Sequence, residues 1–299
     1  MQRSDAGLFG PGSATWRIHR ENALMLGGGR ALVLQASHPL VAAGIEQHSR
    51  YLTDRWGRLT HTLTTMRELI YGDARTAQRS ADRIVRTHAR VRGTVPIGRA
   101  AGRTYDATDP SLIMWVWATL VDTALVTYQR FVKPLPVAEV ARYYEEQKRW
   151  AYACGMPDGC LPARVADFDG YVAETIAAII EPTATAREVL AVILNPWNLP
   201  PALARPALAV LRLPTVGLLP PAVRSALSLS WTSTDERALR ALSHTSRALV
   251  PLLPSVLRHV PAARRAAAVA EPTAEAADLR FYRGPRSASA AADPSAKKS

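Results

Sequence analysis

The sequence predicts an all-α fold, a single globular helical bundle with globin-like helix packing and no sheet. Apolar residues recur at helical spacing along most of the chain, and the alternation typical of strands is almost absent. The 299 residues, 48% of them apolar, are enough to enclose one large core. No internal repeat or change in composition divides the chain, so we expect one domain over residues 1–284. Residues 285–299 contain no large apolar side chain, which predicts a disordered tail.

Caps and breaks place the individual helices. Gly27 to Gly29 form a turn before the first long helix, Pro39 suits the first turn of the next, and Asp109-Pro110 is a strong helix start. Helices are predicted over 30–36, 40–51, 58–71, 74–92, 111–128, 136–153, 165–180, 234–249 and 252–259. A loop is predicted over 94–108, and short helices and turns over 196–221.

The predicted helix over 111–128 is apolar on nearly every face and approaches the length needed to cross a membrane. Asp122 and several hydroxyl side chains interrupt it, and it stands alone. We therefore expect a central buried helix of a helical bundle.

Composition limits the partners and the compartment. The net charge of +12 comes largely from arginines scattered over predicted helix surfaces, a pattern that argues against a nucleic-acid interface. A basic surface also suits peripheral contact with an anionic membrane. Cys154 and Cys160 match neither a zinc site nor a disulfide framework, and the N-terminus carries no secretory signal pattern, so a cytoplasmic location is expected.

His88 has the most informative surroundings of the seven histidines. A helix from the N-cap Asp73 to the stop at Gly93 aligns Ala77, Ala81, Ile84, His88 and Val91 on one face, with arginines on the opposite side. His88 is therefore expected to point inward. Two interpretations stay open on this pattern, a core histidine bonded to a carbonyl or carboxylate, and an axial ligand to a buried metal or haem.

A second polar group falls on the predicted helix over 58–71, where Arg58, His61, Thr62 and Thr65 share a face. Arg58 could pair with a cofactor carboxylate, and His61 could donate a hydrogen bond or a proton to a bound oxidant. The alternative is a solvated helix edge.

Arg92 follows His88 by four residues, which would stack the two on adjoining helical turns and favour a neutral, ligating imidazole. His38, Glu46 and His48 form a further set, but their spacing matches neither a zinc motif nor a di-iron bundle. A phosphate-binding loop, a dinucleotide fingerprint and a nucleophile elbow are all missing from the sequence.

Five segments together resemble a known family, the one that contains the fungal MpaB oxygenase and latex-clearing protein, the rubber oxygenase. These segments are LFGPGSATWRIHRE at 8–21, LGGGRALVLQASHP at 26–39, RLTHT at 58–62, HARVRG at 88–93 and WVWATLVDT at 115–123. The resemblance implies an all-α fold around a buried b-type haem. It also implies oxidative cleavage of a carbon–carbon double bond in isoprenoid chains by dioxygen.

The same resemblance implies roles for single residues. His88 matches the proximal haem-iron ligand and Arg92 the arginine one turn on, while Arg58 and Thr62 match the distal-side segment. His61 stands where rubber oxygenases have a lysine that closes the distal iron site, so it becomes a possible distal ligand or distal base. The segment from Trp115 to Thr119 is expected to line the pocket.

The sequence-based hypothesis is a haem-b-dependent oxygenase acting on a small apolar substrate, unsaturated, isoprenoid or lipid in character. Two alternatives stay open. One is a haem-binding redox or gas-sensing protein without oxygenase turnover, with His88 and His61 in both axial positions. The other is a non-catalytic lipid-binding bundle whose buried polar residues are structural.

Overall fold

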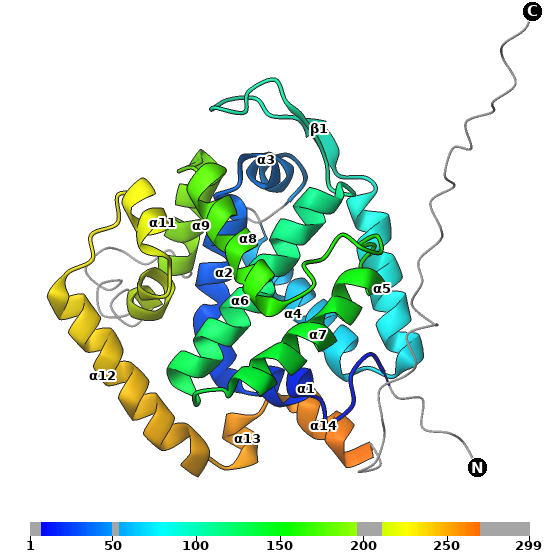
Figure 1. Cartoon of the computed structure of the whole chain (residues 1–299), viewed down its shortest axis with the longest axis vertical. Coiled ribbons are helices and arrows are strands. Elements are labelled where there is room, and N and C mark those ends of the chain that lie inside the picture. Colours follow the sequence, from blue (N-terminus) through cyan, green and yellow to red (C-terminus); the bar gives the residue numbers. More distant parts are fainter. Residues whose placement is uncertain (1–6, 50–53, 196–210, 270–299) are drawn as a thin grey trace, which may run out of the picture.

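The computed structural model describes residues 7–49, 54–195 and 211–269. This part of the chain is predominantly helical, as the sequence predicts, and its helices surround the long α6, Pro110–Phe131 (Figure 1). Most of α6 is buried, from Leu112 to Phe131, because its apolar residues cover nearly the whole circumference. The helix is long and apolar enough to cross a membrane, yet 72% of its most apolar window is buried inside the fold. This agrees with the expected role as a core helix.

The other helices lie before and after α6 in the chain. The helices before α6 are α1 (Ala14–His19), η1 (Asn22–Gly27), α2 (Gly28–Ala36), α3 (Pro39–His48), α4 (Arg55–Tyr71) and α5 (Ala74–His88). Those after it are α7 (Val137–Ala153), α8 (Val165–Ala178), α9 (Ala184–Leu194), α11 (Pro221–Ala226), α12 (Ser233–Leu249), η2 (Val250–Leu252), α13 (Ser255–Arg258) and α14 (Pro261–Val269), with residues 211–217 also helical.

Helices α4 and α5 form an antiparallel hairpin that carries the predicted polar groups. Asp73 caps α5 as predicted, since its carboxylate accepts a hydrogen bond from the Thr76 amide at 2.7 Å. Inside the hairpin Leu69, Ala77 and Ala81 are fully buried. The tight α4–α5 turn therefore leaves the beginning of α4 and the end of α5 together at the other end of the hairpin.

The structure corrects the predicted end of α5 and the prediction of no sheet. The helix ends at His88, and residues Arg92–Thr94 form strand β1, which pairs antiparallel with β2, Thr104–Asp106, inside the predicted loop. The Val91 amide donates to the His88 carbonyl at 2.9 Å, and the Arg92 guanidinium donates to the Ala89 carbonyl at 2.7 Å. These bonds satisfy carbonyls at the helix end without a further turn, which is why the helical pattern stops early.

Further differences concern boundaries and helices that the sequence analysis missed. Helix α3 ends at His48, before the predicted end at residue 51, and Pro254 divides the predicted helix over 252–259 into η2 and α13. Helices α9 and α14 were not predicted. Residues 196–210 of the predicted irregular stretch and the predicted tail lie outside the described residues.

The glycines before α2 allow two elements to approach closely. A Cβ on Gly27 would lie 2.1 Å from the Thr127 hydroxyl of α6, which no side chain tolerates. The structure places the predicted turn at Gly27 to Gly29 within the end of η1 and the start of α2. Gly27 is required for close packing against α6, and Gly29 for packing against Thr215, where a Cβ would lie 2.6 Å from the hydroxyl.

Candidate functional site

The open end of the α4–α5 hairpin brings two of the predicted site residues together. Arg58 lies in the first turns of α4, and His88 is the last residue of α5. Burial lowers the pKa of the half-buried His88 imidazole, and the positive charge of Arg58 lowers it further. His88 is therefore held as a neutral imidazole, the form that can donate a nitrogen lone pair to a metal.

His88 has a free nitrogen in a buried position. Its Nδ1 atom has no hydrogen-bond partner among the residues that the structure describes, and the same holds for the buried Thr65 hydroxyl on the facing helix. A buried polar atom without a partner is uncommon because its desolvation is not compensated. The core-histidine interpretation requires a hydrogen bond from the ring to a carbonyl or carboxylate. The Nδ1 atom makes no such bond to a described residue, so the structure does not support that interpretation at this atom.

Apolar side chains of α4, α5 and α6 locate the open end of the hairpin. Met66 of α4, Ile84 of α5 and Leu120 of α6 pack against one apolar cluster, which contains the buried Leu69 and Ala81. One turn further along the same three faces stand Thr62, His88 and Val116. The end of α5 and the start of α6 both join the β1–β2 hairpin, so these turns lie at the same end of the molecule. We define this region as the candidate site.

The polar residues of α4 differ in their exposure. Arg58 and His61 are exposed, Thr62 is half-buried and Thr65 is buried. The predicted shared face therefore becomes more buried along α4 from Arg58 to Thr65. The Thr62 hydroxyl donates to the Arg58 carbonyl at 3.0 Å, a bond within the helix that leaves its oxygen able to accept. No hydrogen bond ties His61 to the rest of the described chain.

Arg92 does not take the predicted position. It was expected one helical turn beyond His88, but its side chain is exposed in β1 and bonds the Ala89 carbonyl. The chain turns away after α5, so the four-residue spacing does not produce stacked side chains here.

Trp115 and Thr119 are buried on α6 and fixed to α2. The Trp115 indole donates to the Leu34 carbonyl at 3.3 Å, and the Gln35 amide donates to the Thr119 hydroxyl at 3.0 Å. Between them Val116 keeps accessible surface, although its neighbours along α6 are buried. No hydrogen bond or ion pair between described residues joins this group directly to Arg58 or His88.

His38, Glu46 and His48 do not assemble into a metal site. His38 and His48 stand at opposite ends of α3, and His48 lies 3.2 Å from the Arg92 carbonyl through Nε2. His38 packs beside Trp115 with ring centroids 6.3 Å apart, and burial, with a smaller contribution from the charge of Arg103, lowers its pKa to about 4. Across the described ranges no three His, Cys, Asp or Glu side chains come together as a metal site.

Comparison with known proteins identifies the family. Residues 16–248 match the family model described as "ER-bound oxygenase mpaB/B'/Rubber oxygenase, catalytic domain". The chain belongs to this oxygenase family. It is also 28% identical over 177 residues to two uncharacterised mycobacterial proteins, Mb2261 of Mycobacterium bovis and Rv2237 of Mycobacterium tuberculosis, covering 56% of this chain and 68% of each of them. No solved structure matches the chain at a comparable level of significance.

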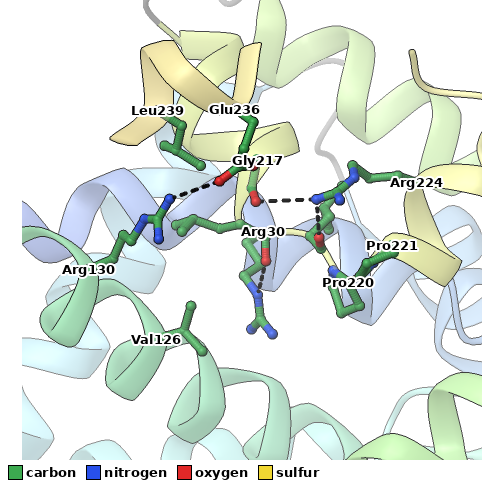
Figure 2. Close-up of a pocket in the computed structure, with 11 residues that line it drawn as sticks. Arg30, Val126, Arg130, Gly217, Pro220, Pro221, Arg224, Glu236 and Leu239 are labelled. Atoms are coloured by element: carbon green, nitrogen blue, oxygen red, sulfur yellow. Dashed lines mark hydrogen bonds and ion pairs between the residues drawn. The ribbon is translucent and has the colours of Figure 1, made fainter. Parts of the chain in front are cut away.

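This member of the oxygenase family also has a pocket of mixed polar and apolar lining that the sequence does not predict. Its volume is about 350 Å³, and Figure 2 shows Arg30, Arg130 and Arg224 around it. The Arg224 guanidinium donates to two backbone carbonyls, and Arg130 reaches Glu236 at 3.4 Å. None of the predicted site residues lines this pocket, so it is separate from the candidate site.

Arg30 and Asp122 are the buried polar pair that the sequence analysis failed to connect. The Arg30 guanidinium donates to Asp122 at 2.5 Å, to the Thr123 hydroxyl at 2.6 Å and to the Leu218 carbonyl at 2.8 Å. The sequence does contain a signal for this pair, because Arg30 and Asp122 are each a charged residue in an otherwise apolar helix. With all three of its donor groups engaged, Arg30 fixes α2 against α6 and serves the architecture of the fold.

Proposed function

We propose that the protein is a haem-b-dependent oxygenase that uses dioxygen on an apolar substrate. The observation that carries the proposal is the neutral His88 imidazole, with an unpartnered buried nitrogen, beside Arg58 at the candidate site. Family membership supports oxygenase chemistry in general. The haem cofactor and the apolar substrate go beyond family membership and are part of our proposal.

The available donor groups fit a haem better than a metal held by side chains alone. A porphyrin supplies four nitrogen donors, so a single histidine completes the proximal coordination. The described residues offer one such histidine at the site and no cluster of three ligating side chains. When bound, a haem supplies the activation of dioxygen.

Each side chain of the candidate site then has a definite task. His88 would hold the iron, and its neutral state requires no deprotonation before binding. The permanent charge of Arg58 would pair with a haem carboxylate or polarise dioxygen, together with a hydrogen bond from His61. Thr62 would assist through its half-buried hydroxyl. The resemblance of HARVRG at 88–93 assigns Arg92 to the cofactor as well.

The central helix would form the apolar wall of the site. Trp115 is rigidly placed by its indole hydrogen bond, Thr119 is bonded to Gln35, and Val116 presents accessible apolar surface between them. Such a wall selects a substrate by apolar contact, which favours an unsaturated isoprenoid or lipid chain over a sugar or a nucleotide. We place this activity in the cytoplasm, with peripheral contact to a membrane where such a substrate dissolves.

A haem-binding redox or gas sensor is the second candidate function. It is favoured by His61, which stands one turn along α4 from Arg58, at the position where rubber oxygenases have a lysine. If His61 were to hold the haem iron together with His88, the iron could not take up dioxygen.

Optical spectroscopy of the purified protein tests the proposal. We expect a Soret band, a change on anaerobic reduction, and a further change when air is admitted, followed by oxygen consumption with a polyisoprenoid added. A ferrous spectrum that is six-coordinate, low-spin and indifferent to oxygen would support the sensor instead. A protein that takes up no haem during reconstitution would refute both and leave the lipid-binding bundle.

A further inference from the structure

The segment after α12 presents an apolar surface to solvent. Five large apolar side chains within nine residues are exposed, and we call them the C-terminal apolar face. They are Leu249 (53% exposed), Leu252 (77%), Leu253 (40%), Val256 (57%) and Leu257 (61%). A cluster of this kind is unusual on a protein surface and marks an interaction site more often than an isolated leucine does.

The face is held rigidly and is not a frayed end. The Val250 side chain is buried in the main core, and the Asn22 amide donates to the Leu257 carbonyl at 2.8 Å. The Arg258 guanidinium binds both oxygens of the buried Glu21 carboxylate, at 2.9 and 3.0 Å. Backbone and polar groups thus attach the segment to η1 and its N-terminal flank, while the leucines point outward.

The segment that carries the face is rich in arginine and poor in acidic residues. Residues 237–269 contain six arginines and no aspartate or glutamate. Glu21 is neutralised by Arg258, and the Arg247 guanidinium donates to the Gln129 carbonyl of α6. Arg264 and Arg265 of α14 form no ion pair with a described carboxylate. Figure 1 shows the end of α12, α13 and α14 together at the lower end of the molecule. An apolar face next to the unpaired arginines of α14 is complementary to an anionic surface with an apolar interior.

We propose that the C-terminal apolar face docks on an anionic lipid bilayer. The leucines and Val256 insert among the acyl chains near the headgroups, and the surrounding arginines bind the lipid phosphates. A protein partner fits less well, because the cores of protein interfaces are enriched in aromatic residues and the face contains only leucine and valine. The face supplies a site for the peripheral membrane contact of the proposed function, but it shares no residue with the candidate site, so vesicle binding is tested separately from oxygenase turnover.

Vesicle cosedimentation of the full-length protein tests the proposal. We expect binding to phosphatidylcholine vesicles that contain about 30 mol% phosphatidylglycerol, and weaker binding to phosphatidylcholine alone. The double variant Leu252→Ser/Leu257→Ser should bind the anionic vesicles at least about tenfold more weakly, because two side chains no longer enter the lipid. Arg265→Ser should lower binding about fivefold, the value of one charge near such a surface.

The matched control is the double variant Ile97→Ser/Val137→Ser, which removes two apolar side chains of similar exposure (68% and 82%) elsewhere on the surface. It should bind like the parent, and circular dichroism should show both double variants folded. Equal binding by the two double variants would overturn the proposal, as would a parent protein that ignores anionic vesicles. Self-association in solution that Leu252→Ser/Leu257→Ser abolishes, without vesicle binding, would assign the face to a second copy of the chain instead.

Discussion

Arg58 acts on His88 across the open end of the α4–α5 hairpin, and its positive charge adds to burial in lowering the pKa of that imidazole. The two residues are 30 positions apart in sequence, and the antiparallel hairpin alone brings them together. Because a nearby cation disfavours imidazolium, the arrangement keeps the histidine nitrogen available for ligation.

Replacement of His88 should remove haem. His88→Ala deletes the proposed iron ligand while leaving the apolar packing of α5 unchanged, so the variant should remain helical and lose its Soret band. Absorbance after reconstitution and circular dichroism measure the two properties. His244→Ala is the control, because His244 is exposed on α12. Full haem content in His88→Ala would falsify the assignment of the ligand.

Arg58 and Arg92 should differ in their effect on His88. Arg58→Ala removes the charge that lowers the pKa of His88, so that pKa should rise in a titration followed by NMR. Arg92→Ala should leave the pKa unchanged, because its guanidinium is exposed and bonded to Ala89. Haem retention by Arg92→Ala tests the cofactor role implied by family resemblance. An unchanged haem spectrum and an unchanged haem affinity in Arg92→Ala would show that Arg92 is a surface charge without a role in cofactor binding.

The sequence predicts the helices well where a cap or an apolar face defines them. Asp73 and Asp109 both cap helices in the structure, and α6 is buried as its composition implies. The same signals point to His88, because the stripe from Ala77 to Ile84 continues to it at helical spacing. Local patterns therefore recover the main elements and the central residue of the site.

What the sequence misses depends on contacts between distant residues. The end of α5 is set by the pairing of Gly93 with Tyr105 in the β1–β2 hairpin, which helical periodicity does not register. The partnership of Arg30 with Asp122 joins residues 92 positions apart. The sequence also does not predict that Leu252 and Leu257 are exposed, because leucines are usually buried in a core.

Stability should fall on acidification because His38 stays neutral in the fold. Burial lowers its pKa to about 4, so below the unfolded value near 6.5 only the unfolded chain takes up the proton. The contribution is complete above pH 6.5 and is lost progressively as pH falls towards 4. Between pH 7.5 and 5.5 His38 should account for about 1 kcal/mol of lost unfolding free energy. Urea unfolding of the parent and of His38→Gln at both pH values measures it, and identical losses in the two proteins would refute it.

The Arg30–Asp122 pair should be costly to break on one side only. Arg30→Met leaves the largely buried Asp122 carboxylate without its partner and should reduce the free energy of unfolding by about 3 kcal/mol. The double variant Arg30→Met/Asp122→Leu removes both charges and should recover part of that loss. Denaturant unfolding of the parent, of Arg30→Met, of Asp122→Leu and of the double variant measures these changes. A double variant less stable than the sum of the single changes would contradict the role of the pair.

His61 decides between the enzyme and the sensor, because its two proposed roles respond differently to removal. If His61 ligates the iron, His61→Ala opens a coordination position, and cyanide or imidazole should bind faster than to the parent. If it donates a hydrogen bond or a proton to dioxygen instead, coordination stays the same and turnover on an isoprenoid substrate should fall about 10²-fold or more. His61→Lys, which introduces the residue of rubber oxygenases, should keep turnover in the second case. Ligand-binding rates and oxygen consumption that are both unchanged in His61→Ala would exclude either role. The search for the distal group would then move to the buried His38, which lies beside Trp115 on the wall formed by α6.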